Sequence, residues 1–324
     1  MSQRLAKPMS IASALACFLA LAAPAAPAAR PRFFVMGDGA LAMVNGHTDE
    51  RTRVSYRRSD GSYDPEALSR IRWLFRSRTD GREGVLSLRL LEVLSALQQR
   101  ARIPELVLVS GYRSSEFNEA LRQSGRQAAG GSLHTEGLAA DLAFPRPRLP
   151  ALWHVVRALD CCGVGLYERE GFLHVDVGRP RFWEAATSRV SENLSRENAR
   201  LFARTEFDRY RSGEPITVTL HAMTVPPVAI TGEAWLVSEH GARVALRVER
   251  GDAEATKPQA SSATESLPDA DAGRDRRCLV VTPGDRLTLR DVVREERASV
   301  ELATCEPRSG QTPATVETNP IEID

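Results

Sequence analysis

Apolar residues recur at helical spacing in four segments of the first half of the chain. This pattern predicts helices that begin at Pro65 and near Ser115, and helices over Ser87–Gln99 and Trp153–Leu159. Asp64 and Pro65 are typical of a helix start, because Asp caps helix N-termini and Pro fits the first helical position. We therefore expect several helices in this half of the chain.

Short apolar runs between these helices predict strands. Leu106–Val109 has the composition of a buried strand, and Leu138–Phe144 follows a turn that contains Gly137. Gly165–Tyr167 and Phe172–Val177 flank a polar turn, which predicts a β-hairpin. Helices around a few mostly antiparallel strands indicate the α+β class, with one small sheet.

The pattern changes after Trp183. The charged stretch Ser188–Tyr210 has helical character and is predicted to be a connector. Alternating apolar and polar residues then predict strands over Ile216–Met223, Val228–Val237, Arg243–Val248, Leu279–Thr282, Arg286–Leu289 and Val300–Cys305. A segment of Ala, Ser, Asp, Glu and Pro at about 251–276 predicts a disordered insert. We expect an α+β domain over 30–187, a connector over 188–211 and a small β-rich domain over 212–324.

The composition is that of a globular protein, and the charge is balanced. Hydrophobic residues make up 42% of the chain and charged residues 26%, with 43 basic and 42 acidic residues and a net charge of +1. Such a balance gives no field that would attract nucleic acid or an anionic membrane. We therefore expect no nucleic-acid partner.

The first 29 residues have the features of a secretory signal peptide. Arg4 and Lys7 precede the apolar run Met9–Ala23, and small residues follow over Ala23–Ala29. We do not expect lipid anchoring at Cys17, because the expected large aliphatic residue is missing three positions before it. No later segment has 18 consecutive apolar residues, so no integral membrane span is expected. These features predict a periplasmic protein.

The remaining cysteines fall into two pairs. Cys278 and Cys305 both lie in strand-like segments, and in an oxidising compartment they form a plausible disulfide. Cys161 and Cys162 are adjacent, where a mutual bond would be strained, so we expect free and buried thiols there.

Two histidines and an aspartate have the spacing of a catalytic metal site. His134 lies at a loop end, Asp141 follows on the next strand, and His174 lies on the predicted hairpin. Two imidazoles and a carboxylate are ligands that zinc takes, and a catalytic zinc keeps its fourth position for water. Bound zinc lowers the pKa of that water to about 7, which yields a nucleophile at neutral pH. Asp176 points to the same strand face as His174, because side chains alternate along a strand.

These residues belong to motifs that resemble the M15-type zinc D,D-peptidases, and most of all the periplasmic DUF882/YcbK-like murein endopeptidase branch. The motifs are Ser110–Ser114, Ser132–Asp141, Gly163–Tyr167 and Phe172–Gly178, with the upstream stretches His47–Glu50 and Asp60–Tyr63. The resemblance covers roughly residues 33–185 and implies the zinc D,D-peptidase and hedgehog-like fold. It does not cover the C-terminal region.

The resemblance implies a role for each residue of the site. His134, Asp141 and His174 would be the zinc ligands, and Arg113 would bind the scissile carbonyl and stabilise the oxyanion. Many relatives have a carboxylate three residues before the second histidine, where this chain has Gly171. Asp176 is the first candidate for the general base, although it could instead orient a ligand. Glu170 is the alternative base.

The resemblance implies a zinc-dependent murein D,D-endopeptidase that cleaves the cross-link peptides of peptidoglycan. A D,D-carboxypeptidase of the same family is an alternative. A catalytically silent zinc-containing module that binds the cell envelope is another, because Gly171 stands where an acid is expected. Arg113 beside all three ligands favours catalysis.

Overall fold

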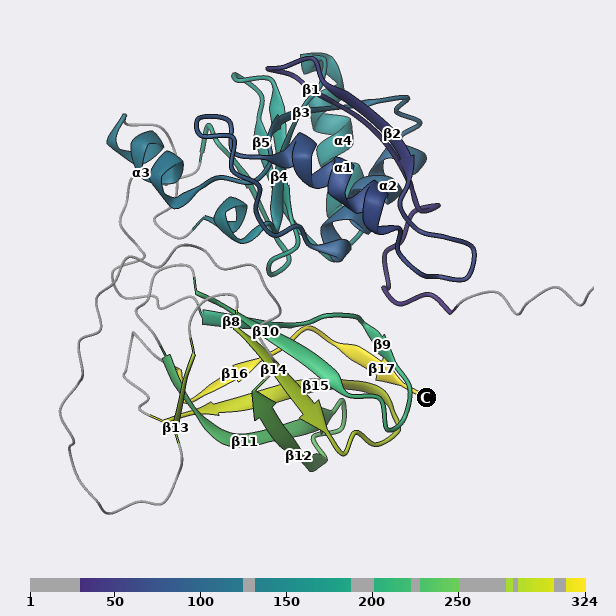
Figure 1. The fold of residues 1–324 in the computed structure, drawn as a ribbon, viewed down its shortest axis with the longest axis vertical. Helices are drawn as coiled ribbons and strands as arrows, with labels where there is room; N and C mark the ends of the chain where they lie inside the picture. Colours follow the sequence, from purple (N-terminus) through teal and green to yellow (C-terminus); the bar gives the residue numbers. More distant parts are fainter. Residues whose placement is uncertain are drawn as a thin grey trace, which may run out of the picture.

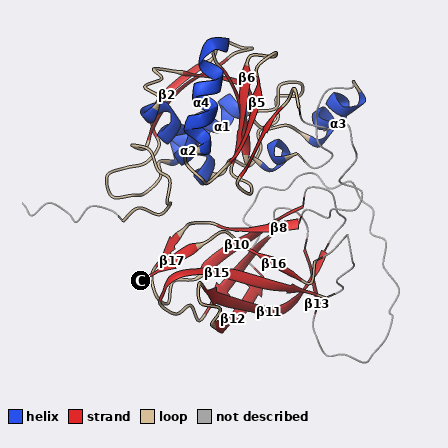
Figure 2. Cartoon of the chain, turned by 180° about the vertical axis from the view of Figure 1, so that it is seen from behind, coloured by secondary structure: helices blue, strands red, loops and turns tan. Residues whose placement is uncertain are grey.

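The computed structural model describes residues 30–124, 132–187, 201–222, 228–250, 278–281, 285–305 and 313–324. The strands form two separate sheets, and the helices of these residues all lie with the first sheet (Figures 1 and 2). The predicted signal peptide over 1–29, residues 188–200 of the predicted connector and the predicted insert over 251–276 lie outside the described residues.

The first sheet has seven strands in the order β2-β1-β3-β4-β6-β5-β7. Their bounds are β1 Ala40–Asn45, β2 Arg51–Ser55, β3 Leu106–Ser110, β4 Ala139–Ala143, β5 Gly163–Tyr167, β6 Phe172–Asp176 and β7 Arg181–Glu184. Strands β1 and β3 are parallel, as are β5 and β7, and the other neighbours are antiparallel. The sheet is therefore mixed.

Helices cover the apolar face of this sheet. The helices are α1 Pro65–Phe75, α2 Leu88–Arg100, α3 Ser115–Gln123 and α4 Leu149–Arg157, with short 3₁₀ turns η1 Leu133–Glu136 and η2 Arg146–Arg148. Figure 1 shows α1, α2 and α4 together beside the sheet and α3 apart from them. Leu94 of α2 packs in one buried core with Leu142 of β4 and Leu173 of β6. The helices therefore occupy one face of the first sheet. Side chains on the opposite face point away from these helices.

Local caps fix where two of these helices begin. The Asp64 side chain accepts hydrogen bonds from the backbone N–H groups of Glu66 and Ala67 at the start of α1. Ser114 accepts from the backbone N–H of Phe117 at the start of α3. Both side chains satisfy donors that a helix N-terminus leaves without intrahelical partners.

The second sheet has ten strands, in the order β8-β10-β14-β12-β11-β15-β17-β9, with β13 paired to β11 and β16 paired to β15. Their bounds are β8 Leu201–Thr205, β9 Arg209–Tyr210, β10 Ile216–Ala222, β11 Val228–Ser238, β12 Arg243–Arg250, β13 Cys278–Val281, β14 Arg286–Arg290, β15 Glu295–Thr304, β16 Thr315–Glu317 and β17 Ile321–Ile323. Strands β9 and β17 are parallel. Ile216, Leu287 and Val300 belong to a separate buried core.

Each cysteine pair is joined in the structure. A disulfide links Cys278 in β13 to Cys305, which directly follows β15. The adjacent Cys161 and Cys162 are also joined, whereas free thiols were expected there. Among the described residues, no helix is both long enough and apolar enough to cross a bilayer.

The predicted fold class is wrong. We expected a small, mostly antiparallel sheet flanked by helices and a small β-rich domain, but the chain is rich in strands and forms two large mixed sheets. The first sheet is larger than expected because β1, β2 and β7 extend it. Strands β2 and β7 alternate between partly buried and exposed residues, so they carry no apolar pattern that predicts a strand.

The helical character predicted for Ser188–Tyr210 is also wrong over its described part. Residues 201–205 form β8, which pairs with β10, and 209–210 form β9. Strand β8 buries Leu201, Phe202 and Ala203. Burial against neighbouring strands outweighs a weak local pattern in a segment of this kind.

Candidate metal site

The alternation of side chains along β4 and β6 positions two of the three predicted ligands. Ala140 and Leu142 of β4 pack in the core under the helices, so Asp141 points to the opposite face of the sheet. Asp141 is directly opposite His174 in the antiparallel β4–β6 pair. Residues opposite each other in such a pair share a face and lie side by side. The register therefore brings this carboxylate and this imidazole together.

His134 reaches the same place from the turn η1 that precedes β4. It is 2% exposed, and its Nδ1 lies 2.7 Å from the carbonyl oxygen of Gly111, which can only accept a hydrogen bond. Gly137 ends η1 with φ of +67°, a left-handed conformation that favours glycine. An added Cβ there would collide with the carbonyl oxygen of Val85. Gly137 thus permits the tight turn that connects His134 to Asp141.

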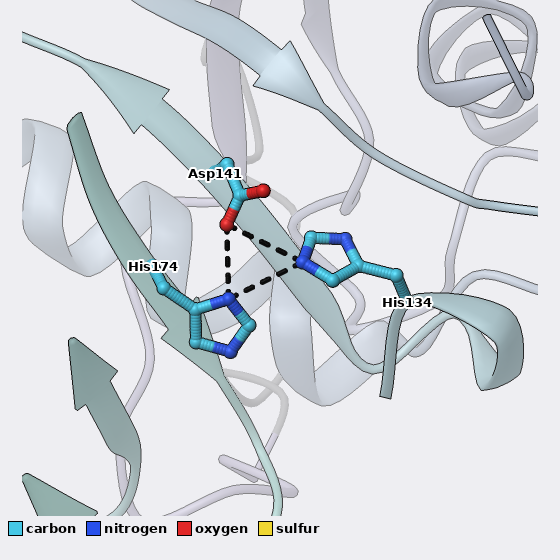
Figure 3. Close-up of side chains that lie close together, drawn as sticks. All are labelled: His134, Asp141 and His174. Carbon is cyan, nitrogen blue, oxygen red and sulfur yellow. Dashed lines mark hydrogen bonds and ion pairs between the residues drawn. The ribbon is translucent and has the colours of Figure 1, made fainter. Parts of the chain in front are cut away.

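The three side chains converge on one point (Figure 3). His134 Nε2 lies 3.2 Å from His174 Nδ1 and 3.3 Å from Asp141 Oδ1. The distance between His174 Nδ1 and Asp141 Oδ1 is 2.9 Å. Tetrahedral zinc with bonds of about 2.0–2.1 Å would separate its ligand atoms by roughly 3.3 Å. The spacing of the three atoms is close to that of a tetrahedral metal site.

The outer hydrogen bonds direct the histidine lone pairs inward. The Nδ1–H of His134 donates to the carbonyl oxygen of Gly111, and His174 Nε2 lies 2.9 Å from the Asp176 carboxylate. The remaining nitrogens, His134 Nε2 and His174 Nδ1, face Asp141 Oδ1, and each carries a lone pair when its ring is neutral. With both rings neutral, the three groups present acceptors that repel one another unless a cation lies between them, so the donor set fits a divalent metal ion.

Burial and nearby charges shift the pKa of each group. Burial, with the Arg113 charge, lowers the pKa of His134 to about 4. Burial also lowers the pKa of His174, but hydrogen bonds to Asp141 and Asp176 outweigh it and raise that pKa. Burial raises the pKa of Asp141, yet the two histidines and Arg113 hold it well below its usual value. His134 and Asp141 are therefore deprotonated near neutral pH, as metal ligands must be.

Arg113 lies against the cluster. One end of its guanidinium, Nη2, donates to Asp141 Oδ2, and Nε donates to Ser110 Oγ at 2.9 Å. Its backbone N–H donates to the carbonyl oxygen of His134 at 3.2 Å. Nη1 has no hydrogen-bond partner among the residues that the structure describes. The guanidinium is thus fixed through Nε and Nη2 against Ser110 and Asp141.

Asp176, the first candidate for the base, is fully buried and fully engaged. Oδ2 meets His174 Nε2 and Arg181 Nη2, while Oδ1 accepts from Arg181 Nη1 and from the backbone N–H of Gly178. Burial raises its pKa, but His174 and Arg181 outweigh this and lower it to about 2. Its oxygens lie on the side of His174 away from the cluster.

Glu170 and His47 lie outside the cluster. Glu170 is exposed in the turn between β5 and β6. The exposed His47 has its Nε2 3.0 Å from the carbonyl oxygen of Val109 and contacts Arg78. The structure therefore does not bring these two residues into contact with the three ligands.

Sequence reasoning missed an aromatic pair beside His174. The rings of Trp183 and His174 have centroids 5.3 Å apart, and the Trp183 indole N–H donates to the Tyr167 hydroxyl at 3.3 Å. Gly165 lies opposite His174, and a Cβ there would collide with the Trp183 ring. The repeated glycines before Tyr167 were the available signal, because a strand glycine permits close approach of another group.

Gly137→Ala is expected to lower the free energy of unfolding by more than about 2 kcal/mol. A left-handed conformation costs a residue with a Cβ about 1–2 kcal/mol, and the collision with Val85 adds to this. Urea denaturation measures the change. Gly171→Ala is the matched control, because Gly171 has φ of +84° but open space around it. Equal losses for the two variants would contradict the role assigned to the Val85 contact.

Comparisons with known proteins show which family this chain resembles. The family model described as Peptidoglycan L,D-endopeptidase MepK matches residues 36–183. The chain is 31% identical over 144 residues to the peptidoglycan L,D-endopeptidase MepK of Escherichia coli (strain K12), which covers 44% of this chain and 79% of that protein. It is 27% identical over 146 residues to the probable peptidoglycan L,D-endopeptidase MepK of Haemophilus influenzae. That match covers 44% of this chain and 78% of the relative. No solved structure matches the chain.

The matched region contains the whole candidate site. Residues 36–183 include η1, β4 and β6, which carry the three converging side chains, and also Arg113. The second sheet lies beyond the matched region. On the similarity to the relatives, which extends over more than three quarters of their length, the chain belongs to the M15-type peptidase family of the peptidoglycan L,D-endopeptidase MepK.

Proposed function

We propose that this protein is a zinc-dependent peptidoglycan endopeptidase that cleaves L,D bonds in the peptides of the wall. The observation that carries the proposal is the convergence of His134 Nε2, Asp141 Oδ1 and His174 Nδ1 on one point, with His134 and Asp141 buried. Membership of a family whose named relatives are peptidoglycan L,D-endopeptidases supports the substrate class.

Zinc would be held by His134, Asp141 and His174. Imidazole and carboxylate together suit zinc, and three protein ligands are what its catalytic sites have. When bound there, the metal would lower the pKa of a water molecule and polarise the scissile carbonyl. The hydrogen bond from His134 to Gly111 and the contact of His174 with Asp176 fix both rings in the orientation that binding needs.

Arg113 would stabilise the negative charge that develops on the scissile carbonyl oxygen. Its bonds to Asp141 and Ser110 hold the guanidinium in place before substrate arrives. Nη1, which has no hydrogen-bond partner among the described residues, can then donate to that oxygen without reorganisation of the site. Fixed donors of this kind stabilise a transition state more than they stabilise the substrate.

Of the two candidate bases, Glu170 has the carboxylate that is available to accept a proton. Asp176 is 0% exposed, and its oxygens already contact His174, Arg181 and Gly178, so its geometry suits the orientation of His174. Glu170 is exposed at the hairpin turn, and its carboxylate has no hydrogen-bond or ion-pair partner among the described residues. We therefore assign the orientation of His174 to Asp176 and proton acceptance to Glu170.

The bond specificity distinguishes this proposal from the D,D-endopeptidase expected from the motifs. The motifs contain the groups that hold a metal and stabilise an oxyanion, and such groups act on the carbonyl whichever configuration its neighbours have. The names of the relatives specify an L,D bond, and we adopt it for this chain.

The substrate and the N-terminus together support a periplasmic location. Residues 1–29 have the composition of a signal peptide, and the proposed substrate lies outside the inner membrane. We propose peptidoglycan stem and cross-link peptides as the partners of the site.

Cross-linked muropeptide dimers with either an L,D or a D,D scissile bond test the proposal. Zinc-loaded full-length protein is expected to convert the L,D dimers to monomers, and a chelator is expected to stop the reaction until zinc is restored. Conversion of D,D dimers alone would replace the L,D assignment with the D,D one, and release of terminal D-Ala alone would indicate a carboxypeptidase. Binding of both dimers without conversion would indicate a silent envelope-binding module.

The same assay separates the two carboxylates. Glu170→Gln is expected to lower kcat about 100-fold with zinc affinity unchanged, because general base catalysis contributes roughly 10²–10⁴-fold. Asp176→Asn is expected to weaken zinc binding instead, by about 10–100-fold, because it removes the partner of a ligand. The assignment is wrong if Glu170→Gln keeps full rate.

A further inference from the structure

We propose that the second sheet supports the metal site from outside, because residues of β8 and β10 contact the two segments that carry or orient the histidine ligands. His221 of β10 and Arg204 of β8 are the positioning residues. This inference rests on the proposed function only in that both require His134 and His174 to bind a metal.

His221 contacts the turn that carries His134. Its Nδ1 contacts the carboxylate of Glu136, the last residue of η1, across 85 residues of sequence. His221 is 5% exposed, and its ring stacks on Phe202 with centroids 5.0 Å apart and planes at 28°. The turn η1 has only four residues, so Glu136 cannot shift without moving His134.

Arg204 donates a hydrogen bond to the loop that orients His174. Its Nη2 donates to the carbonyl oxygen of Gly178. The backbone N–H of Gly178 donates to Asp176 Oδ1 at 2.8 Å, and Asp176 Oδ2 lies 2.9 Å from His174 Nε2. A second bond joins the same segments, since Arg179 Nη2 donates to the carbonyl oxygen of Leu201 at 3.3 Å. Displacement of this loop would therefore change the hydrogen bonds that fix the His174 ring.

Strand β8 is anchored firmly enough to act as a support. Phe202 is 3% exposed and belongs to the core of the first sheet, although it lies on a strand of the second. Beyond β8, the buried Asp208 accepts from the backbone N–H of Phe34 at 2.9 Å and pairs with Arg89. Arg89 also donates to the carbonyl oxygen of Thr205 at 3.0 Å. Buried polar groups that find partners across the junction favour a fixed contact between the segments.

Two separate routes thus lead from the second sheet to the two histidines. One runs from His221 through Glu136 to His134, and the other from Arg204 through Gly178 and Asp176 to His174. The region matched by the family ends at residue 183, so both supports come from outside it. Partners that orient a metal ligand without touching the metal are worth about 10–100-fold in metal affinity.

The test measures zinc affinity of the full-length chain by competition with a chromophoric chelator. His221→Phe keeps an aromatic ring against Phe202 but removes the contact with Glu136, and Arg204→Met removes the donor to Gly178. Each is expected to weaken zinc binding about 10-fold or more and to change the absorption spectrum of the Co²⁺-substituted protein. Arg204→Lys, which keeps a donor, is expected to recover part of the affinity and guards against a variant that fails to fold.

Arg32→Met is the matched control. Arg32 precedes the first sheet and pairs with Glu214, which lies between β9 and β10 of the second sheet. This contact leads to neither histidine. The control is expected to lower Tm without changing zinc affinity or the Co²⁺ spectrum. Zinc affinity equal to wild type in both His221→Phe and Arg204→Met would overturn the inference. This test measures metal binding, whereas the proposed function is tested by cleavage. The proposed function fails if the zinc-loaded wild type cleaves no muropeptide, and that result leaves the zinc affinities of the variants unchanged.

Discussion

Asp141→Asn is expected to lower kcat/KM on the muropeptide substrate by at least about a thousandfold and to abolish stoichiometric zinc retention. Asp141 supplies the one negative charge among the three converging groups, and its second oxygen holds Arg113. The substitution therefore weakens the metal site and releases the guanidinium together. Loss of roughly 4 kcal/mol of transition-state stabilisation corresponds to about a thousandfold in rate.

Zinc content after dialysis and the initial rate of dimer cleavage measure this prediction. Asp160→Asn is the matched control, because Asp160 is exposed and lies away from the cluster. Its backbone φ of +49° is one that Asn tolerates, so the control should fold and retain both zinc and rate. An Asp141→Asn protein that keeps zinc and half of the wild-type rate would exclude Asp141 as a ligand.

The parts of the fold that local patterns determine were predictable. Asp64 and Pro65 predicted the start of α1, and the apolar residues of Leu106–Val109 predicted β3. Most strands of the second sheet were also predicted, because each alternates apolar and polar residues. These signals lie within a few residues of one another, so the sequence alone reveals them.

The size and mixed character of the sheets could not be predicted in the same way. Strand β7 joins the edge of the first sheet through parallel pairing with β5, and its Phe182 remains exposed. Strand β8 lies in a charged stretch, and its pairing with β10 and the burial of Leu201, Phe202 and Ala203 explain its position. Such pairings depend on contacts between segments far apart in the sequence, which no local pattern records.

For the candidate site, the motifs predicted which residues converge but not how their partners are arranged. The spacing of His134, Asp141 and His174 was sufficient to nominate the ligand set. The orientation of Asp176 depends on Arg181 and on the backbone of Gly178, so its engagement away from the cluster emerges only in three dimensions. The contact between His221 and Glu136 is likewise invisible in the spacing.

Arg113→Ala is expected to lower kcat about 100- to 1000-fold at saturating zinc, with a smaller effect on KM. Removal of one oxyanion donor costs this much in other hydrolases, because the donor acts mainly in the transition state. The guanidinium also holds Asp141, so the variant should bind zinc less tightly as well. Assays at saturating zinc remove this second effect and leave only the loss of the donor.

Arg113→Lys separates the two roles of the guanidinium. An ammonium group can pair with Asp141 or approach the scissile carbonyl, but it lacks the planar fork that allows both at once. The Lys variant is therefore expected to recover most of the zinc affinity and little of the rate. If saturating zinc instead restores the full rate of Arg113→Ala, then Arg113 acts only through Asp141 and the oxyanion role is wrong. If the Lys variant recovers rate and affinity together, a positive charge alone is sufficient and Nη1 has no separate function.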